Sequence, residues 1–164
     1  MGKPAAESNP FLIRAARPAE AEAIVALLQR AFGVYRGKLQ PESSALLETA
    51  DMIRTAMKTG TILLAERAGR ILGCVSVQRK GDCAYAGRLA VEPMEQGIGV
   101  GRALLAAAEA LTRQMGLGRL RVDVRLKLRD NRAFFRALGF VEGAERCHPG
   151  FRSPTYIELE KTLI

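Results

Sequence analysis

Three glycines in alternate positions, Gly97, Gly99 and Gly101, constrain this chain more than any other feature. They follow an apolar segment that ends at Leu89-Ala90-Val91 and precede an alanine- and leucine-rich segment that starts at Arg102. The first segment is typical of a strand and the second of a helix. Glycine has no Cβ, so an anion can approach the loop amides, and the helix N-terminus adds unpaired N–H groups and a positive dipole end. The sequence therefore predicts a phosphate-binding loop between a strand and a helix.

Two common phosphate-binding patterns do not match this loop. The Walker pattern needs a Lys-Ser or Lys-Thr pair after its second glycine, and none follows here. The dinucleotide pattern G-x-G-x-x-G, started at Gly97, has Arg102 in its sixth position. Asp123 lies at about the distance that this fingerprint requires. However, residues 92–96 separate the strand from the first glycine, which is too long for the tight turn of that fold.

The pattern that matches is Q-x-x-G-x-G, formed by Gln96, Gly99 and Gly101. It resembles the acyl-CoA pyrophosphate loop of the GNAT superfamily of N-acetyltransferases. The later segment from Asn131 to Phe140 ends in Leu-Gly-Phe and is similar to the second signature of that family, a short helix. Two motifs in the family order make the resemblance specific.

Length and composition set the limits of the molecule. The chain has 164 residues, which fits one domain, and we expect it to span residues 11–164 after a disordered arm at residues 1–10. No apolar run is long enough to cross a membrane, and residues 1–10 lack the apolar centre of a signal peptide. The three cysteines form neither a disulfide framework nor a paired metal motif. We expect a cytoplasmic protein that binds neither metal nor membrane.

The net charge of +8 is compatible with nucleic acid, an anionic cofactor or an acidic acceptor as partner. Nucleic-acid binders usually gather their charge in one stripe with interleaved aromatic residues. Here the arginines are spread from Arg14 to Arg152 and only 5% of the residues are aromatic, so we expect no nucleic-acid partner. The densest basic cluster, within residues 119–132, lies beside the second motif, where part of it would attract a polyphosphate cofactor.

Hydrophobic periodicity and turn residues give the order β-α-α-β-β-β-α-β-α-β-β. The expected segments are strands from residue 11 and at 61–67, 71–79, 83–91, 119–126, 140–145 and 155–159, and helices at 19–32, 45–58, 101–115 and up to 138. We expect Gly33 to end the first helix in the left-handed conformation, Leu47 to be buried in the second, and Asp130 or Asn131 to cap the last. This order predicts an α+β fold with a mixed, mostly antiparallel central sheet flanked by about four helices, which is the GNAT (acyl-CoA N-acyltransferase) order.

The resemblance implies acetyl-CoA as co-substrate and assigns its contacts. The pyrophosphate is expected on the loop and first helical turn, at Gln96, Gly97, Ile98, Gly99, Val100, Gly101 and Arg102. The pantetheine arm is expected along a strand edge at Leu89, Ala90 and Val91, where two parallel strands separate after a bulge. An N–H group of this strand can donate to the thioester oxygen. Asn131, Phe134 and Phe135 complete the expected cofactor site.

The catalytic positions depart from the family pattern. Phe135 occupies the place of the usual tyrosine, whose hydroxyl protonates the leaving thiolate, and a phenyl ring cannot donate a proton. Tyr85 occupies the place of a glutamate that serves as base in some members, and an ordinary tyrosine is a poor base at neutral pH. Asp123 is expected to pair with neighbouring arginines. The single histidine, His148, has a pKa range suited to proton transfer and is a second catalytic candidate beside Tyr85. Tyr156, Cys147 or water could supply the missing proton.

Three functional hypotheses follow. The first is an N-acetyltransferase that moves an acetyl group from acetyl-CoA to a primary amine of a small molecule or peptide by direct attack in a ternary complex. The second is a CoA-binding domain with weak or no transferase activity, because of Phe135. The third is nucleic-acid binding through the basic surface, which predicts steeply salt-dependent affinity. The family's acceptor side lies at the helices after the first strand, and a homodimer is compatible with the resemblance.

Overall fold

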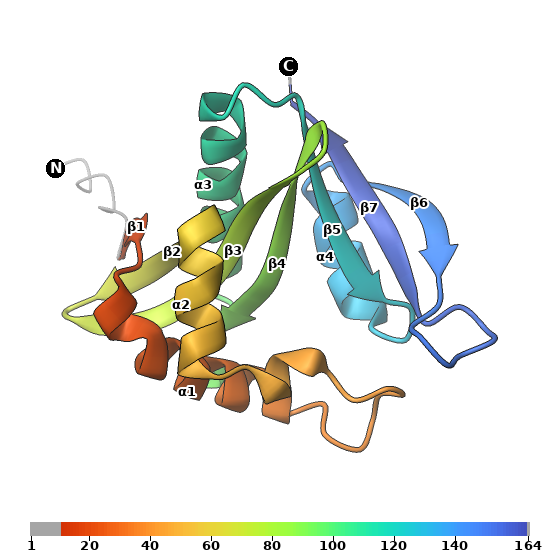
Figure 1. Cartoon of the computed structure of the whole chain (residues 1–164), viewed down its shortest axis with the longest axis horizontal. Helices are drawn as coiled ribbons and strands as arrows, with labels where there is room; N and C mark the ends of the chain where they lie inside the picture. The colour runs from red at the N-terminus through yellow and green to blue at the C-terminus, as the bar shows by residue number, and fades with distance from the viewer. Residues whose placement is uncertain (1–10, 164) are drawn as a thin grey trace, which may run out of the picture.

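A mixed sheet of seven strands runs through residues 11–163, which are the residues that the computed structural model describes (Figure 1). The strand order is β1-β2-β3-β4-β5-β7-β6. Neighbouring strands are antiparallel except β4 and β5, which are parallel. The strands are β1 (Leu12–Ala15), β2 (Gly60–Arg67), β3 (Arg70–Lys80), β4 (Cys83–Val91), β5 (Arg119–Arg125), β6 (Val141–Arg146) and β7 (Tyr156–Thr162).

Four α-helices cover the two faces of this sheet: α1 (Ala21–Gly33), α2 (Ala50–Thr59), α3 (Val100–Gln114) and α4 (Arg129–Ala137). Side chains alternate between faces along a strand, so one strand contributes to two separate cores. On β2, Leu64 packs with α1 and α2, whereas Ala65 packs with α3. Phe135 of α4 belongs to the same core as α3. The helices α1 and α2 therefore lie on one face, and α3 and α4 on the other (Figure 1).

A β-bulge interrupts β4 near its end. The register shifts between Cys74 and Ser76 of β3, so that Arg88 and Leu89 of β4 together oppose Val75. Arg88 adopts the left-handed conformation, with φ of 54°, which is uncommon for a residue with a side chain. A bulge of this kind bends its strand and turns the following residues away from the regular ladder.

The parallel pairing of β4 with β5 is short. It consists of Ala84 with Leu120 and Tyr85 with Arg121. Beyond these pairs the two strands diverge, and Figure 1 shows the resulting gap between β4 and β5 in the middle of the sheet. The backbone of β4 after Tyr85 therefore has no strand on its β5 side. This is the separation that the family resemblance led us to expect.

The observed order of elements confirms the α+β prediction, and β4 has the predicted bounds. Four local expectations were wrong. Gly33 is still part of α1, and the left-handed glycine in the following turn is Gly37, with φ of 73°. The helix expected at 45–58 is a 3-10 turn at Ser44–Leu47 followed by α2, because Thr49 caps α2 by accepting a hydrogen bond from the N–H of Met52.

This break in the expected second helix turns Leu47 outward, and 75% of its surface is exposed rather than buried.

The last expectation concerns the cap of α4. Neither Asp130 nor Asn131 caps that helix, because both lie inside it and Leu128 precedes its first turn without a side-chain cap. The chain turns earlier than predicted, since the N–H of Leu128 already donates to the carbonyl of Arg125 at 3.1 Å.

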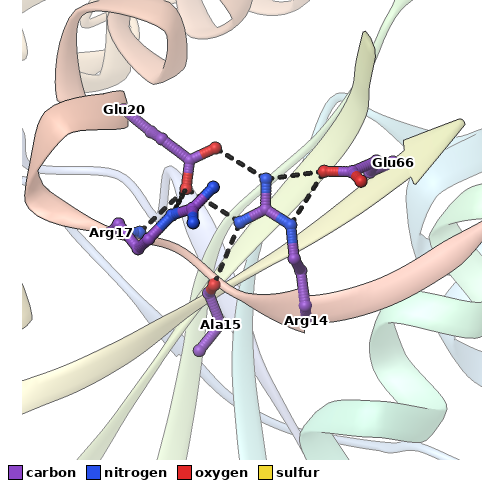
Figure 2. A network of polar contacts seen from close by, with 5 residues as sticks. All are labelled: Arg14, Ala15, Arg17, Glu20 and Glu66. Carbon is purple, nitrogen blue, oxygen red and sulfur yellow. Dashed lines mark hydrogen bonds and ion pairs between the residues drawn. The ribbon is translucent and has the colours of Figure 1, made fainter. Parts of the chain in front are cut away.

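A polar network joins β1, β2 and the 3-10 turn at Pro18–Glu20, which leads into α1 (Figure 2). The guanidinium of Arg14 donates to Glu20 at 2.7 and 2.8 Å and to Glu66 at 2.8 Å. Glu20 also accepts a hydrogen bond from the N–H of Arg17. Mainly because of the hydrogen bond from Arg14, the pKa of Glu20 is lowered to about 2. One arginine thus holds two carboxylates at the same time.

Candidate active site

A cavity of about 730 Å³ opens where β4 and β5 separate. Its wall comes from β4, the glycine loop, the first turn of α3, the end of β5, α4 and the loop between β6 and β7. All but one of the predicted site residues line it: Tyr85, Leu89, Ala90, Val91, Gln96, Gly97, Gly99, Val100, Gly101, Arg102, Asn131, Phe134, Phe135 and His148. The exception is Ile98, which lies outside the lining with 45% of its surface exposed.

The three positions of the loop favour glycine for different structural reasons. Gly97 and Gly99 have φ of 88° and 92°, and an added Cβ would meet no atom within 4 Å at either place. The left-handed backbone therefore requires them, and the space beside them is open. Gly101 has an ordinary φ, but its Cβ would lie 3.4 Å from Cζ of Phe134 on α4. This glycine lets the first turn of α3 approach α4 closely.

Amide groups converge on the cavity at the start of α3. The first intrahelical bond runs from the N–H of Ala103 to the carbonyl of Gly99, at 3.0 Å. Within residues 11–163, the N–H groups from Gly97 to Arg102 have no backbone acceptor, and Gly99 provides no side-chain cap. Six consecutive donors at the positive end of a fifteen-residue helix form a site for a polyanion.

Ion pairs hold the segment before this loop against the sheet. Glu92 pairs with Arg30 of α1, and its N–H donates to the carbonyl of Leu72 at 2.8 Å. Glu95 pairs with Arg67 of β2 at 2.8 Å. The loop is therefore positioned from both β2 and α1 before it enters α3.

Phe135 is packed into the core between two other aromatic rings. It is 7% exposed, and its ring lies edge-on to Phe134 at 5.3 Å and to Phe140 at 5.5 Å between centroids. This is the packing arrangement that aromatic rings favour. Phe135 forms part of the cavity wall and of the core, and its ring donates no proton.

Tyr85 lies at the centre of the sheet, where β4 still pairs with β5. Burial and the neighbouring carboxylate of Asp123 raise the pKa of Tyr85 to about 12. The ammonium of Lys80 lies 4.3 Å from the centre of its ring. Tyr85 therefore stays protonated at neutral pH and is available as a hydrogen-bond donor, which agrees with the expectation that it is a poor base.

Asp123 of β5 lines the cavity in addition to pairing with an arginine, which was its only expected role. Its Oδ1 lies 3.8 Å from Nε of Arg121, which is an ion pair at long distance. Within residues 11–163 both of these buried atoms lack a hydrogen-bond partner. Burial is the main reason that the pKa of Asp123 is raised. The expected ion pair exists, but the carboxylate also lines the cavity.

His148 enters the same cavity from the loop between β6 and β7. Its Nδ1 contacts Oγ1 of Thr155, and its ring packs edge-on against Tyr156 with 4.9 Å between centroids. Burial and the nearby charge of Arg125 lower its pKa below the usual value of 6.5. The imidazole is therefore neutral at neutral pH, and within residues 11–163 its Nε2 has no hydrogen-bond partner. Tyr156 and Cys147, the other proton donors considered, also line the cavity.

A second cavity of about 380 Å³ adjoins the first on the α1 and α2 side of the sheet. Both cavities are lined by Ser44, Tyr85, Gly87 and Arg88. The sequence placed the acceptor side near these helices and, of these four residues, indicated only Tyr85. Their assembly depends on the bulge of β4 and on the end of the loop before α2, which no local motif encodes.

Within residues 11–163, no helix is long and apolar enough to cross a membrane. In the same part of the chain, no three histidine, cysteine, aspartate or glutamate side chains are grouped so that they could hold a metal ion.

Comparison with known proteins gives a family and two relatives. Residues 21–140 match the model of the family described as the acetyltransferase (GNAT) family. An IAA acetyltransferase of Azospirillum brasilense is 28% identical over 124 residues, which are 74% of this chain and 78% of that protein. A probable N-acetyltransferase 14 of Danio rerio is 32% identical over 93 residues. These are 55% of this chain but only 33% of the fish protein.

Solved structures share the fold at low sequence identity. The PaiA N-acetyltransferase of Thermoplasma acidophilum, in complex with coenzyme A, superposes with a TM-score of 0.78 and 17% identity over 93% of this chain and 98% of that one. The ribosomal-protein-S18-alanine N-acetyltransferase of Escherichia coli superposes with a TM-score of 0.75 and 20% identity over 93% of this chain and 94% of that one. A GCN5-related N-acetyltransferase of Rhodopseudomonas palustris superposes with a TM-score of 0.77 and 20% identity over 93% of this chain and 96% of that one.

Proposed function

This chain belongs to the acetyltransferase (GNAT) family, and on that premise we propose that it transfers an acetyl group from acetyl-CoA to a primary amine by direct attack in a ternary complex. The observation that carries the proposal is the row of six amides without a backbone acceptor, Gly97 to Arg102, in a segment that, apart from Ile98, lines a large cavity where β4 and β5 separate. The names of the two relatives, both acetyltransferases, also support it.

The residues present fit the coenzyme. The open space beside Gly97 and Gly99 leaves room for a pyrophosphate against the loop amides, and Arg102 adds a cation. The edge of β4 at residues 89–91 has no strand on its β5 side, so an extended pantetheine arm could pair with it there. Asn131 and Phe134 of α4 would close the site from the other side.

When bound, acetyl-CoA supplies the thioester carbon that the amine attacks. The carbon–nitrogen bond forms, the carbon–sulfur bond breaks, the amine loses one proton and the sulfur gains one. We expect an N–H group of β4 at residues 89–91 to stabilise the negative charge on the carbonyl oxygen. The chain's task is therefore to hold the two reactants and to move these protons.

We assign proton removal to Nε2 of His148, because this imidazole is neutral at neutral pH and lines the cavity. Tyr85 cannot act as base, since its pKa of about 12 keeps the phenol protonated. The hydroxyl of Tyr156, packed against His148, is our candidate for protonating the sulfur in place of Phe135. Protonation of a thiolate is a modest requirement, because thiols have a pKa of about 8.5.

Amine-dependent release of CoA tests this function. The protein is incubated with acetyl-CoA and a panel of amino acids, dipeptides and other primary amines, and the free thiol is followed over time. We expect at least one amine to accelerate thiol release and to appear as its acetylated product by mass spectrometry. A reaction without amine measures simple thioester hydrolysis. Binding of acetyl-CoA with no amine-dependent release would contradict the proposal and favour a CoA-binding domain.

A further inference from the structure

Arg88 occupies an unusual position between the two cavities. It lines both of them from the bulge of β4, and its φ of 54° is a conformation that glycine adopts more easily. Its Nε donates to Glu48 at 3.1 Å and its Nη2 to Oγ of Ser44 at 3.0 Å. A strained residue whose side chain enters a cavity indicates a function for that side chain.

Arg125 faces the larger cavity from the opposite strand, β5. Its Nη2 donates to the carbonyl oxygen of Glu42 at 3.3 Å. The carboxylate of Glu42 accepts instead from the N–H of Gly37, at 2.7 Å. Burial lowers the pKa of Arg125, which shows that the guanidinium is partly removed from water. Within residues 11–163 it forms no ion pair, and the charge of the Glu42 carboxylate only partly offsets the effect of burial on its pKa.

Both arginines thus line the larger cavity, together with Asp123 and Glu95, and of the two arginines only Arg88 pairs with a carboxylate, Glu48. Both also contact the chain segment from Glu42 to Glu48, which lies over the opening between the strands. Arg14 shows that one guanidinium in this protein can hold two carboxylates at once (Figure 2). A ligand carboxylate can therefore join Arg88 and Arg125 without displacing Glu48.

The smaller cavity offers a different surface beside these cations. Its wall on the helix side is apolar and consists of Ile24, Leu28, Met52, Ile53 and Ala56. A volume of about 380 Å³ is enough for an amino acid side chain but small for a polymer. An acceptor with one anionic group and an apolar body matches this combination.

Given the proposed acetyltransferase function, on which this inference rests, we propose that Arg88 and Arg125 bind a carboxylate of the acceptor. The substrate class is then an amino acid, or a related amino-carboxylate, whose apolar body occupies the smaller cavity. Arg88 immediately precedes the β4 segment at 89–91 where the thioester is expected. A carboxylate bound to Arg88 would hold a nearby amine close to the reacting carbon.

Matched acceptors test this class directly. Rates of acetylation are compared for L-leucine and L-leucinamide, and for L-methionine and L-methioninamide. Loss of the carboxylate lowers the pKa of the amine and leaves more of it neutral, so intrinsic reactivity favours the amides. We expect the enzyme to reverse this order, with kcat/KM about tenfold or more in favour of the free acids.

Arginine variants connect the preference to the two residues. Arg88→Gly suits the left-handed backbone, and Arg125→Gln keeps a polar side chain, so both should fold. We expect each variant to lose most of the preference for free acids and to raise the acceptor KM, with the KM for acetyl-CoA unchanged. Arg54→Gln is the matched control, because it removes an ion pair between α2 and α1 and lines neither cavity. Thermal unfolding confirms that each variant is folded.

Several results would overturn the inference. Amides acetylated as fast as the free acids would show that no carboxylate is recognised. A raised KM for acetyl-CoA in Arg125→Gln would assign this arginine to the coenzyme instead. Turnover of other primary amines without turnover of any amino acid would reject the substrate class and leave the acetyltransferase function intact. Absence of turnover with every primary amine, in contrast, is a failure of the proposed function itself.

Discussion

The proposed proton transfer uses side chains that differ from the usual family positions. Phe135 is buried among other phenyl rings, and Tyr85 is held as a neutral phenol, so neither can perform the step that its position suggests. His148, Tyr156 and Asp123 line the same cavity from the opposite part of the sheet. Under the proposed assignment, proton transfer is therefore carried out from β7 and the loop before it rather than from α4 and β4.

Replacing His148 should change the pH dependence of the rate. Because burial lowers its pKa below 6.5, the acid limb that His148 contributes to the wild-type kcat/KM should appear as the pH drops through that lowered value, where the imidazole becomes protonated. His148→Gln should reduce kcat/KM about 100-fold and remove this acid limb. The limb caused by protonation of the amine substrate lies at higher pH and should remain in both proteins.

The matched control for this experiment is Ser153→Ala, an exposed position in the same loop that lines neither cavity. It should keep the wild-type profile. An unchanged acid limb in His148→Gln would contradict the assignment of His148 as base and would point to water or Asp123.

The local motif predicted a glycine loop that, apart from Ile98, does line the cavity, because these residues lie in one continuous segment. It could not predict Arg88, Arg125 or Asp123 as partners in one region. These residues line one cavity only because β4 bulges and then separates from β5. Such side-chain assembly depends on tertiary geometry, which hydrophobic periodicity does not encode.

Elements with strong periodicity were predicted closely, and β4 even has its predicted bounds. The start of the second helix was predicted too early in the chain. Leu46 and Leu47 extend its apolar pattern toward the N-terminus, so the pattern does not reveal the cap at Thr49. A threonine followed by Ala-Asp was the available signal for a helix cap. Tertiary contacts decided the outcome, since the preceding segment is tied to Arg88 through Ser44 and Glu48.

The network of Arg14 joins three elements and should make stability depend on pH in a defined window. Glu20 has a pKa lowered from 4.5 to about 2, so its stabilising contribution is present above pH 4.5 and is lost as the pH falls toward 2. Glu20→Gln should therefore lower the free energy of unfolding at pH 7 by roughly 1 kcal/mol.

This difference between wild type and Glu20→Gln should shrink as the pH falls below 4.5 and disappear near pH 2, measured by urea unfolding at several pH values. Glu145→Gln, an exposed change on β6, serves as control and should show no such trend. A difference that stays constant across the acid range would contradict the role given to the Arg14 network.

Considered as a whole, the molecule distributes its charge of +8 unevenly. In the basic segment at 119–132, carboxylates pair with Arg119, Arg121 and Arg132, whereas Arg125 forms no ion pair within the described residues. Much of the basic composition therefore forms intramolecular ion pairs. The positive potential that matters for ligands lies at the N-terminus of α3 and at the opening between β4 and β5.

The most direct test of the account is calorimetric titration of acetyl-CoA into wild type and Gly99→Asp. The aspartate side chain would enter the open space where the pyrophosphate is expected and would add a negative charge there. Gly69→Asp is the control, because Gly69 has a similar left-handed φ of 77°, open space around it, and a place in the turn between β2 and β3. Both variants share the backbone strain, and only one alters the loop.

We predict that wild type and Gly69→Asp bind acetyl-CoA with the same Kd and that Gly99→Asp binds it about 100-fold or more weakly, a loss of about 2.7 kcal/mol. Equal affinity in all three proteins would contradict the placement of the pyrophosphate on the glycine loop. No binding to wild type would contradict the acetyl-CoA-dependent function as a whole.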